Sequence, residues 1–357
     1  MQGLNNPIGI KSLEPSQSPF ITNPYRFGGG GVGGWVELGR TTLGSGNSTI
    51  NVSGLADKRY YMILSYTLGN GNNNVRCRLN ADIAANYANR WTNNGAADSS
   101  EVNKNWQHYD PNVVGKLNGF TVGYLSNLPT KEKLDMFNSA GQMAAGAGNA
   151  PSRSETVNKW ANTSAAFDEI DVINEGGTFD TGSEVVVLGW DPEDTHTTNF
   201  WEELASDTSS GSVASLESGT FTAKKYLWIQ CYVTTSASTF CETLFNNDTG
   251  SNYANRASQN GGTDFTRTSQ SDLNMFESYG NTTGAYINAF MINNASNEKL
   301  GISHSVREGT SGAGNAPVRD ENVFKWANTS DQITDISFTP QSGTINSGSY
   351  LKVWGSD

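Results

Sequence analysis

Apolar and polar residues alternate with a period of two in the most hydrophobic segments of this chain. In the segment 58–68 (KRYYMILSYTL), four large residues fall on one side of an extended strand, namely Tyr60, Met62, Leu64 and Tyr66. Ile63 falls on the other side. Large residues on both faces predict a central strand that is covered on both sides. The segment 224–234 (KKYLWIQCYVT) has a similar pattern and predicts a second strand of this kind.

Other short apolar segments predict further strands in corresponding pairs. They are 117–125 with 284–292, 132–137 with 298–303, 167–173 with 333–338, and 184–188 with 350–354. Clusters of Gly, Asn and Ser separate these segments, as turns do. About eight short strands in each half of the chain predict two antiparallel β-sandwiches or jelly rolls. Helical periodicity is weak, and the segment 156–160 is the one candidate for a helical turn.

The paired segments belong to a duplicated domain. Three motifs recur at an offset of 166 residues: GAGNAP (146–151 and 312–317), KWANTS (159–164 and 325–330) and NYANR (86–90 and 252–256). Residues 35–191 align with 201–357 without gaps, and the short polar segment 192–200 links them. The second copy serves as an internal comparison, because residues that carry a shared function should occur in both repeats.

Residues 1–34 are different in kind from the repeats. Prolines at positions 7, 15, 19 and 24 precede a glycine-rich run, a composition that favours an extended path and a flexible joint. The segment also carries apolar anchors, which include Ile8, Ile10, Phe20, Ile21, Tyr25 and Phe27. We therefore expect an arm that docks on a partner. A disordered leader is the alternative.

Composition and charge exclude several functional classes. The chain has 357 residues, of which 36% are hydrophobic and 16% charged, with 39 glycines, and this composition is typical of a turn-rich β protein. The net charge of −12 argues against nucleic-acid binding, which requires a basic surface. The sequence has no stretch of about 18 apolar residues, so no membrane span is predicted. The first residues lack the basic and apolar blocks of a signal peptide, so secretion by that route is not expected.

Cysteines and histidines differ between the two repeats. The three cysteines, Cys77, Cys231 and Cys241, align with other residue types, so we expect free, buried thiols and no disulfide framework. The same holds for His108 and His304, and His196 lies in the linker. A catalytic triad or a histidine metal site cannot then be common to both repeats. We expect neither enzyme activity nor a cofactor.

The NYANR motif has two interpretations. Arginine beside tyrosine and asparagine could bind a carboxylate or a sugar, since these side chains offer donors and acceptors in fixed geometry. The residues concerned are Asn86, Tyr87, Asn89 and Arg90, with Asn252, Tyr253, Asn255 and Arg256. The alternative is a strand that ends in an Asn-Gly turn, where the arginine pairs with Asp98 or Asp264. The structural interpretation is favoured.

The remaining shared motifs are also ambiguous. GAGNAP lacks the Lys-Ser/Thr ending of a nucleotide-binding loop and is expected to form a glycine-dependent turn. Trp160 and Trp326 are expected in the core or at a domain edge, with glycan stacking as the alternative. The shared aspartates could ligate calcium, but we favour turn capping or salt bridges for Asp82, Asp98, Asp248 and Asp264.

Taken as a set, these motifs carry a resemblance. The Trp-Glu-x-Leu start at 201–204, the tyrosine-rich strand, the three repeated motifs and the ending Gly-Ser-x-x-x-Val-x-Gly-x-Asp resemble a family of uncharacterised tandem-repeat, β-rich proteins of marine bacteriophages and environmental viruses. The resemblance covers both repeats but not the arm. It implies a structural component of the virion and supplies no catalytic residues.

The sequence thus predicts an all-β chain of two tandem jelly-roll-like sandwiches behind an extended N-terminal arm. We expect a virion structural protein that binds copies of itself, most plausibly as a homotrimer, and other virion proteins, without nucleic acid or membrane. A capsid decoration or tail fibre is favoured slightly over a component of the shell. One alternative is a lectin-like module that binds host glycans, and a second is a double jelly-roll major capsid protein.

Overall fold

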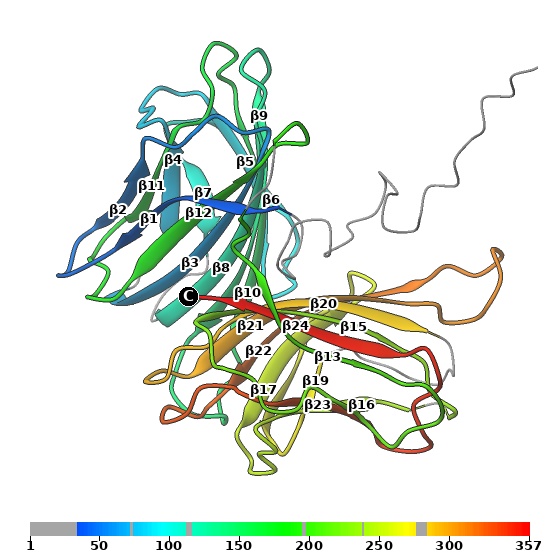
Figure 1. Ribbon diagram of the computed structural model, residues 1–357. Helices are drawn as coiled ribbons and strands as arrows, with labels where there is room; N and C mark the ends of the chain where they lie inside the picture. The colour runs from blue at the N-terminus through cyan, green and yellow to red at the C-terminus, as the bar shows by residue number, and fades with distance from the viewer. Residues whose placement is uncertain (1–33, 72–73, 112–115, 195–197, 238, 276–283) are drawn as a thin grey trace, which may run out of the picture.

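The chain folds into two β-sandwiches that lie one against the other (Figure 1). The computed structural model describes residues 34–71, 74–111, 116–194, 198–237, 239–275 and 284–357. These residues form 24 strands, all paired antiparallel, and no helix. The predicted fold class, two tandem jelly-roll-like antiparallel β-sandwiches, is confirmed for the described residues. The anchors expected in the N-terminal arm, Ile8, Ile10, Phe20, Ile21, Tyr25 and Phe27, lie outside them.

Each repeat contains one eight-stranded and one four-stranded sheet. In the first repeat the large sheet has the order β1-β12-β3-β8-β9-β10-β5-β6 and the small sheet the order β2-β11-β4-β7. The strands are β1 (Val36–Thr42), β2 (Thr49–Ser53), β3 (Tyr60–Gly71), β4 (Val75–Leu79), β5 (Tyr87–Asn93), β6 (Ser99–Lys104), β7 (Gln107–Asp110), β8 (Lys116–Ser126), β9 (Lys133–Gln142), β10 (Ser152–Trp160), β11 (Glu169–Asn174) and β12 (Glu184–Trp190).

The second repeat has the same topology. Its large sheet has the order β13-β24-β15-β20-β21-β22-β17-β18 and its small sheet the order β14-β23-β16-β19. The strands are β13 (Glu202–Thr208), β14 (Leu216–Glu217), β15 (Tyr226–Val233), β16 (Cys241–Phe245), β17 (Tyr253–Gln259), β18 (Phe265–Gln270), β19 (Leu273–Asn274), β20 (Ala285–Ile292), β21 (Lys299–Arg307), β22 (Val318–Trp326), β23 (Ile336–Pro340) and β24 (Tyr350–Ser356).

The central strand β3 shows why the sandwich forms. Tyr61 and Ile63 face the small sheet and belong to the core of the first repeat, whereas Met62 and Leu64 point to the opposite face. Because successive side chains of a strand point to opposite faces, one strand supplies two separate apolar surfaces. The second surface is covered by the other repeat.

Two local predictions differ in outcome. The Asn-Gly pairs form tight turns after β5 and β17, with positive φ at Asn94 (50°), Gly95 (71°), Asn260 (52°) and Gly261 (70°), as predicted. The helical turn expected at 156–160 is wrong, because these residues lie in β10 between β9 and β5. Ladder hydrogen bonds on both sides of this strand outweigh its weak local preference.

The two large sheets face each other across the junction between the repeats. In Figure 1 the small sheets lie on the far sides of the pair, with β2 and β11 in the upper sandwich and β16 and β23 in the lower one. A continuous hydrophobic cluster joins residues of both large sheets, among them Leu64, Phe120, Val122, Phe290 and Ile302. The pair of sandwiches is therefore held by an apolar interface as well as by the linker.

Candidate interaction surface

The loop 144–151, which carries the first GAGNAP motif, lies against the second repeat. Gly146 has φ of 82°, a value that glycine adopts without strain, and its backbone N–H donates to the Glu298 carboxylate. Lys325 Nζ donates to the Ala144 carbonyl oxygen at 2.9 Å. Arg256 Nε donates to the Pro151 carbonyl oxygen at 2.9 Å. The loop thus offers backbone groups to side chains that lie on β17 and β22 and just before β21 of the second repeat.

A buried ion pair strengthens this junction. Arg153, which follows the loop on β10, donates from its guanidinium to Asp264 Oδ1 at 2.7 Å and to Glu321 Oε2 at 3.1 Å. Burial lowers the pKa of Arg153, but its hydrogen bond to Asp264 and the charges of the surrounding carboxylates outweigh burial and raise the pKa. Since both partners are almost fully buried, each depends on the other for its charge to be tolerated.

A second polar contact lies on another edge of the interface. Glu184 of β12 accepts a hydrogen bond from Tyr226 Oη at 2.8 Å and pairs with Lys225 Nζ at 2.9 Å. Burial raises the pKa of Glu184, but hydrogen bonds from Thr42, Lys225 and Tyr226 outweigh it and lower the pKa. The carboxylate therefore stays charged and ties the two repeats together.

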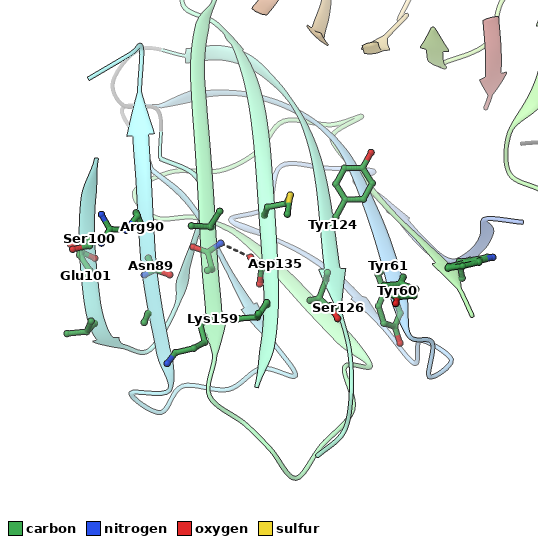
Figure 2. A pocket seen from close by; sticks show the side chains of 18 of the residues that line it. Tyr60, Tyr61, Asn89, Arg90, Ser100, Glu101, Tyr124, Ser126, Asp135 and Lys159 are labelled. Carbon is green, nitrogen blue, oxygen red and sulfur yellow. Dashed lines mark hydrogen bonds between the residues drawn. The ribbon is translucent and has the colours of Figure 1, made fainter. Parts of the chain in front are cut away.

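The first repeat carries an open groove on the outer face of its large sheet. The groove has a volume of about 810 Å³ and is largely apolar. It is lined by Trp35, Tyr60, Tyr61, Ala88, Asn89, Arg90, Ser100, Glu101, Val102, Tyr124, Leu125, Ser126, Leu134, Asp135, Met136, Val157, Asn158, Lys159 and Trp190. Figure 2 shows that these residues come from neighbouring strands, from Ser100 and Glu101 on β6 across to Tyr60 and Tyr61 on β3.

The exposed rim and floor of the groove have a definite chemistry. Leu134, Met136 and Val157 expose apolar surface on adjacent strands, and Tyr60 stacks on Trp190 with ring centroids 5.4 Å apart. Arg90 pairs loosely with Asp98 at 3.6 Å, and Lys159 Nζ pairs with Glu132 at 3.3 Å, all four side chains being largely exposed. An apolar floor with charged donors at the rim suits a protein surface that presents side chains and backbone carbonyl groups.

Most NYANR residues are not available to a ligand. Tyr87 and Tyr253 are buried and their hydroxyl groups bond the backbone at Leu79 and Phe245. Asn89 and Asn255 are also buried, whereas Asn86 and Asn252 are half-buried and bond Asp82 and Asp248. Of the eight candidates, Arg90 is exposed and Arg256 is used at the junction.

Trp160 and Trp326 are core residues, as favoured from the sequence. Trp160 and Trp326 are almost fully buried, and each indole N–H donates to an aspartate, Asp82 or Asp248, at 2.7 Å. A glycan needs an exposed ring face, so a stacking role for these rings is wrong. They lie at the inward-facing ends of β10 and β22.

The shared aspartates serve turns and salt bridges, as favoured from the sequence. Asp82 Oδ1 accepts from the backbone N–H of Ala84 at 2.8 Å, and Asp248 Oδ1 does the same for Gly250. Asp98 and Asp264 pair with arginines. Within the described residues, no group of three or more His, Cys, Asp or Glu side chains could hold a metal ion. The three cysteines are free and buried, as predicted.

Sequence reasoning missed the residues that form the junction. These residues include Arg153 of the first repeat and Glu298 and Lys325 of the second, whose counterparts are Arg319, Glu132 and Lys159. The available signal was that these charged residues are identical in both repeats of a chain that has few charges.

Comparisons with known proteins assign no family to this chain. No family model matches the chain, and no curated protein matches it. Among solved structures, domains LG4-5 of the mouse laminin alpha1 chain align over 89% of this chain and 90% of their own length, with 10% identity and a TM-score of 0.19. The outer membrane protein Ail of Yersinia pestis aligns over 75% and 99%, with 8% identity and a TM-score of 0.14. Similarities this weak carry no argument about function.

The described residues contain no helix that is long and apolar enough to cross a membrane.

Proposed function

We propose that this chain is a structural protein of a virion, which acts by non-covalent assembly and surface recognition without catalysis. A capsid decoration or fibre is favoured over a component of the shell. The observation that carries the proposal is the open apolar groove of the first repeat. A groove of this size, with an apolar floor and a charged rim, is suited to another protein surface.

The resemblance of the repeated motifs to tandem-repeat virion proteins supports the same function. The two sandwiches are joined by a large apolar interface, so one chain presents two similar lobes in a fixed relation. A trimer would then present six such lobes, an arrangement that also suits the second alternative, a double jelly-roll capsid protein.

The test is to locate the chain in intact particles. Virions should be purified from a culture or sample that carries the gene for this chain. Quantitative mass spectrometry should then find the chain in them at a fixed copy number. Cryo-electron microscopy should then place its paired sandwiches in the particle. Absence of the chain from purified particles would overturn the proposal.

A glycan array distinguishes the lectin-like alternative. Selective binding by the wild-type chain that is lost in Arg90→Ala, with unchanged stability, would favour host glycan recognition. The virion proposal predicts that the array shows no selective binding at this groove.

A further inference from the structure

The junction between the repeats uses one surface from each repeat, and each repeat has both surfaces. The loop surface of the first repeat consists of residues 144–151 and Arg153. The receiving surface of the second repeat consists of Glu298, Lys325, Arg256 and Asp264 around the apolar residues Leu300, Ile302 and Val323. Within one chain, a loop surface and a receiving surface are engaged, while their counterparts are not used in this junction.

The counterparts are identical in the residues that make the polar contacts. The receiving surface of the first repeat has Glu132, Lys159, Arg90 and Asp98 at the corresponding positions. The loop surface of the second repeat has GAGNAP at 312–317 and Arg319. Local geometry also matches, because Ser269, which donates its N–H to the Ala147 carbonyl oxygen, and its counterpart Asn103 both have positive φ, of 52° and 54°.

Burial shows which of the two receiving surfaces, and which of the two loop surfaces, is covered. Leu300, Ile302 and Val323 are 0%, 4% and 1% exposed under the first repeat. Their counterparts Leu134, Met136 and Val157 are 57%, 50% and 51% exposed and lie in the groove. The loop 312–317 and Arg319 are likewise exposed. The groove is therefore the uncovered equivalent of a surface that the chain already covers elsewhere.

The large-sheet faces beside the two loop surfaces differ in a way that suits reversible contact. Leu64 and Val122 lie in the junction of the first repeat, and Gln230 and Asn288 replace them in the second. Gln230 Nε2 donates to Tyr286 Oη at 2.8 Å, so this face is hydrogen-bonded before any partner arrives. Interfaces that form between separately soluble proteins are more polar than permanent ones.

We propose that the loop surface of the second repeat docks in the groove of the first repeat of another copy of this chain, in the manner of the internal junction. Gly312 would donate to Glu132, Lys159 and Arg90 would bond loop carbonyl groups, and Arg319 would pair with Asp98. This contact is head-to-tail, because the two copies use different surfaces. Repetition gives a closed ring if the rotation closes and a filament if it does not. The inference rests on the proposed function and names the partner at its groove.

Cysteine cross-linking tests this contact in the full chain. At the internal junction, a Cβ built on Gly148 would lie 3.9 Å from Ser269 Oγ, so cysteines at these two positions would be direct neighbours. The corresponding pair between copies is Gly314 and Asn103. The double variant Gly314→Cys/Asn103→Cys should form a reducible ladder of linked chains under mild oxidation. Because the native cysteines are buried, they should not contribute.

The internal pair provides the matched control. Gly148→Cys/Ser269→Cys should cross-link within one chain and migrate as a monomer. If the control pair forms its disulfide and the Gly314→Cys/Asn103→Cys variant gives no ladder beyond that of its single variants, the inference is overturned. Detection of the chain in virions would still support the proposed function in that case. A ladder from a chain that is absent from virions would overturn the proposed function alone.

Charge reversal gives a second test without cysteines. Sedimentation of the wild-type chain should show association that rises with concentration. Asp98→Arg and Arg319→Asp should each weaken it at least tenfold, and the double variant should restore it. If Met136→Lys abolishes association but Arg319→Asp does not alter it, another part of the chain, such as residues 1–33, occupies the groove and the inference fails.

Discussion

Arg153 and Arg319 occupy equivalent positions in the two repeats but have different surroundings. Arg153 is 5% exposed and faces Asp264, whereas Arg319 is 61% exposed and pairs with Glu321 at 3.1 Å. The same residue thus has a large energetic role where a partner covers it and a small one where water does.

Arg153→Ala should lower the free energy of unfolding by about 3 kcal/mol, because Asp264 would remain buried without its closest partner. Arg319→Ala should change it by less than about 0.5 kcal/mol. Denaturant titration of the two variants measures the difference. Equal losses would contradict the buried ion pair at the junction.

His108 is a buried histidine of the first repeat whose counterpart is Asn274. Burial, together with the charges of Arg76 and Lys104, lowers the pKa of His108 to about 4, although Glu101 lies 3.9 Å away. In the unfolded chain His108 binds a proton below about pH 6.5, whereas in the folded chain it binds one only below about pH 4. Stability must fall as the pH falls across this window.

The free energy of unfolding should fall less in His108→Asn than in the wild-type chain between pH 7 and pH 4. The difference should reach up to about 3 kcal/mol, at about 1.4 kcal/mol for each pH unit of the pKa shift. Denaturant midpoints of both proteins across this range measure it. Asp135, whose pKa burial raises to about 7, titrates in both proteins and cancels in the comparison. Parallel pH profiles would show that His108 does not titrate in this way.

At the scale of elements, identical turns have different neighbours. The Asn-Gly turn after β5 lies at the junction, and a Cβ on Gly95 would overlap the Asp264 carboxylate. The equivalent Gly261 has near it only the flexible end of Arg319, 3.2 Å from the built Cβ. The turn motif is local, but the tolerance of each turn to substitution depends on the other repeat.

Gly95→Ala should cost at least about 2 kcal/mol, from positive φ and from displacement of Asp264, whereas Gly261→Ala should cost about 1 kcal/mol from φ alone. Thermal unfolding of the matched variants decides the point. A Gly95→Ala variant as stable as Gly261→Ala would show that this turn does not pack against Asp264.

At the scale of the whole molecule, the outer faces of the two large sheets differ in polarity. The face of the first repeat is apolar where it meets the second repeat, and the equivalent face of the second repeat carries Gln230 and Asn288. These polar residues keep an exposed sheet face soluble.

Gln230→Leu/Asn288→Val should therefore increase self-association, since it gives the second repeat the apolar face of the first. Light scattering across a concentration series should show a dissociation constant at least tenfold lower than that of the wild-type chain. The surface control Glu217→Gln, on β14 of the small sheet, should leave association unchanged. Unchanged association in the double variant would contradict a role for this face in docking.

The sequence by itself determined the strands, the turns and the duplication, because these depend on period-two burial, glycine and asparagine conformations and residue identity. The pattern of 58–68 even required cover on both faces of β3. Only the tertiary structure decided what supplies that cover, and it placed Lys159 and Arg90 at the rim of a groove, with Glu132 paired to Lys159. The physical reason is that identical motifs in two repeats have identical local preferences. Whether a surface is buried or open depends on which repeat lies against it, and that is a property of the assembled chain.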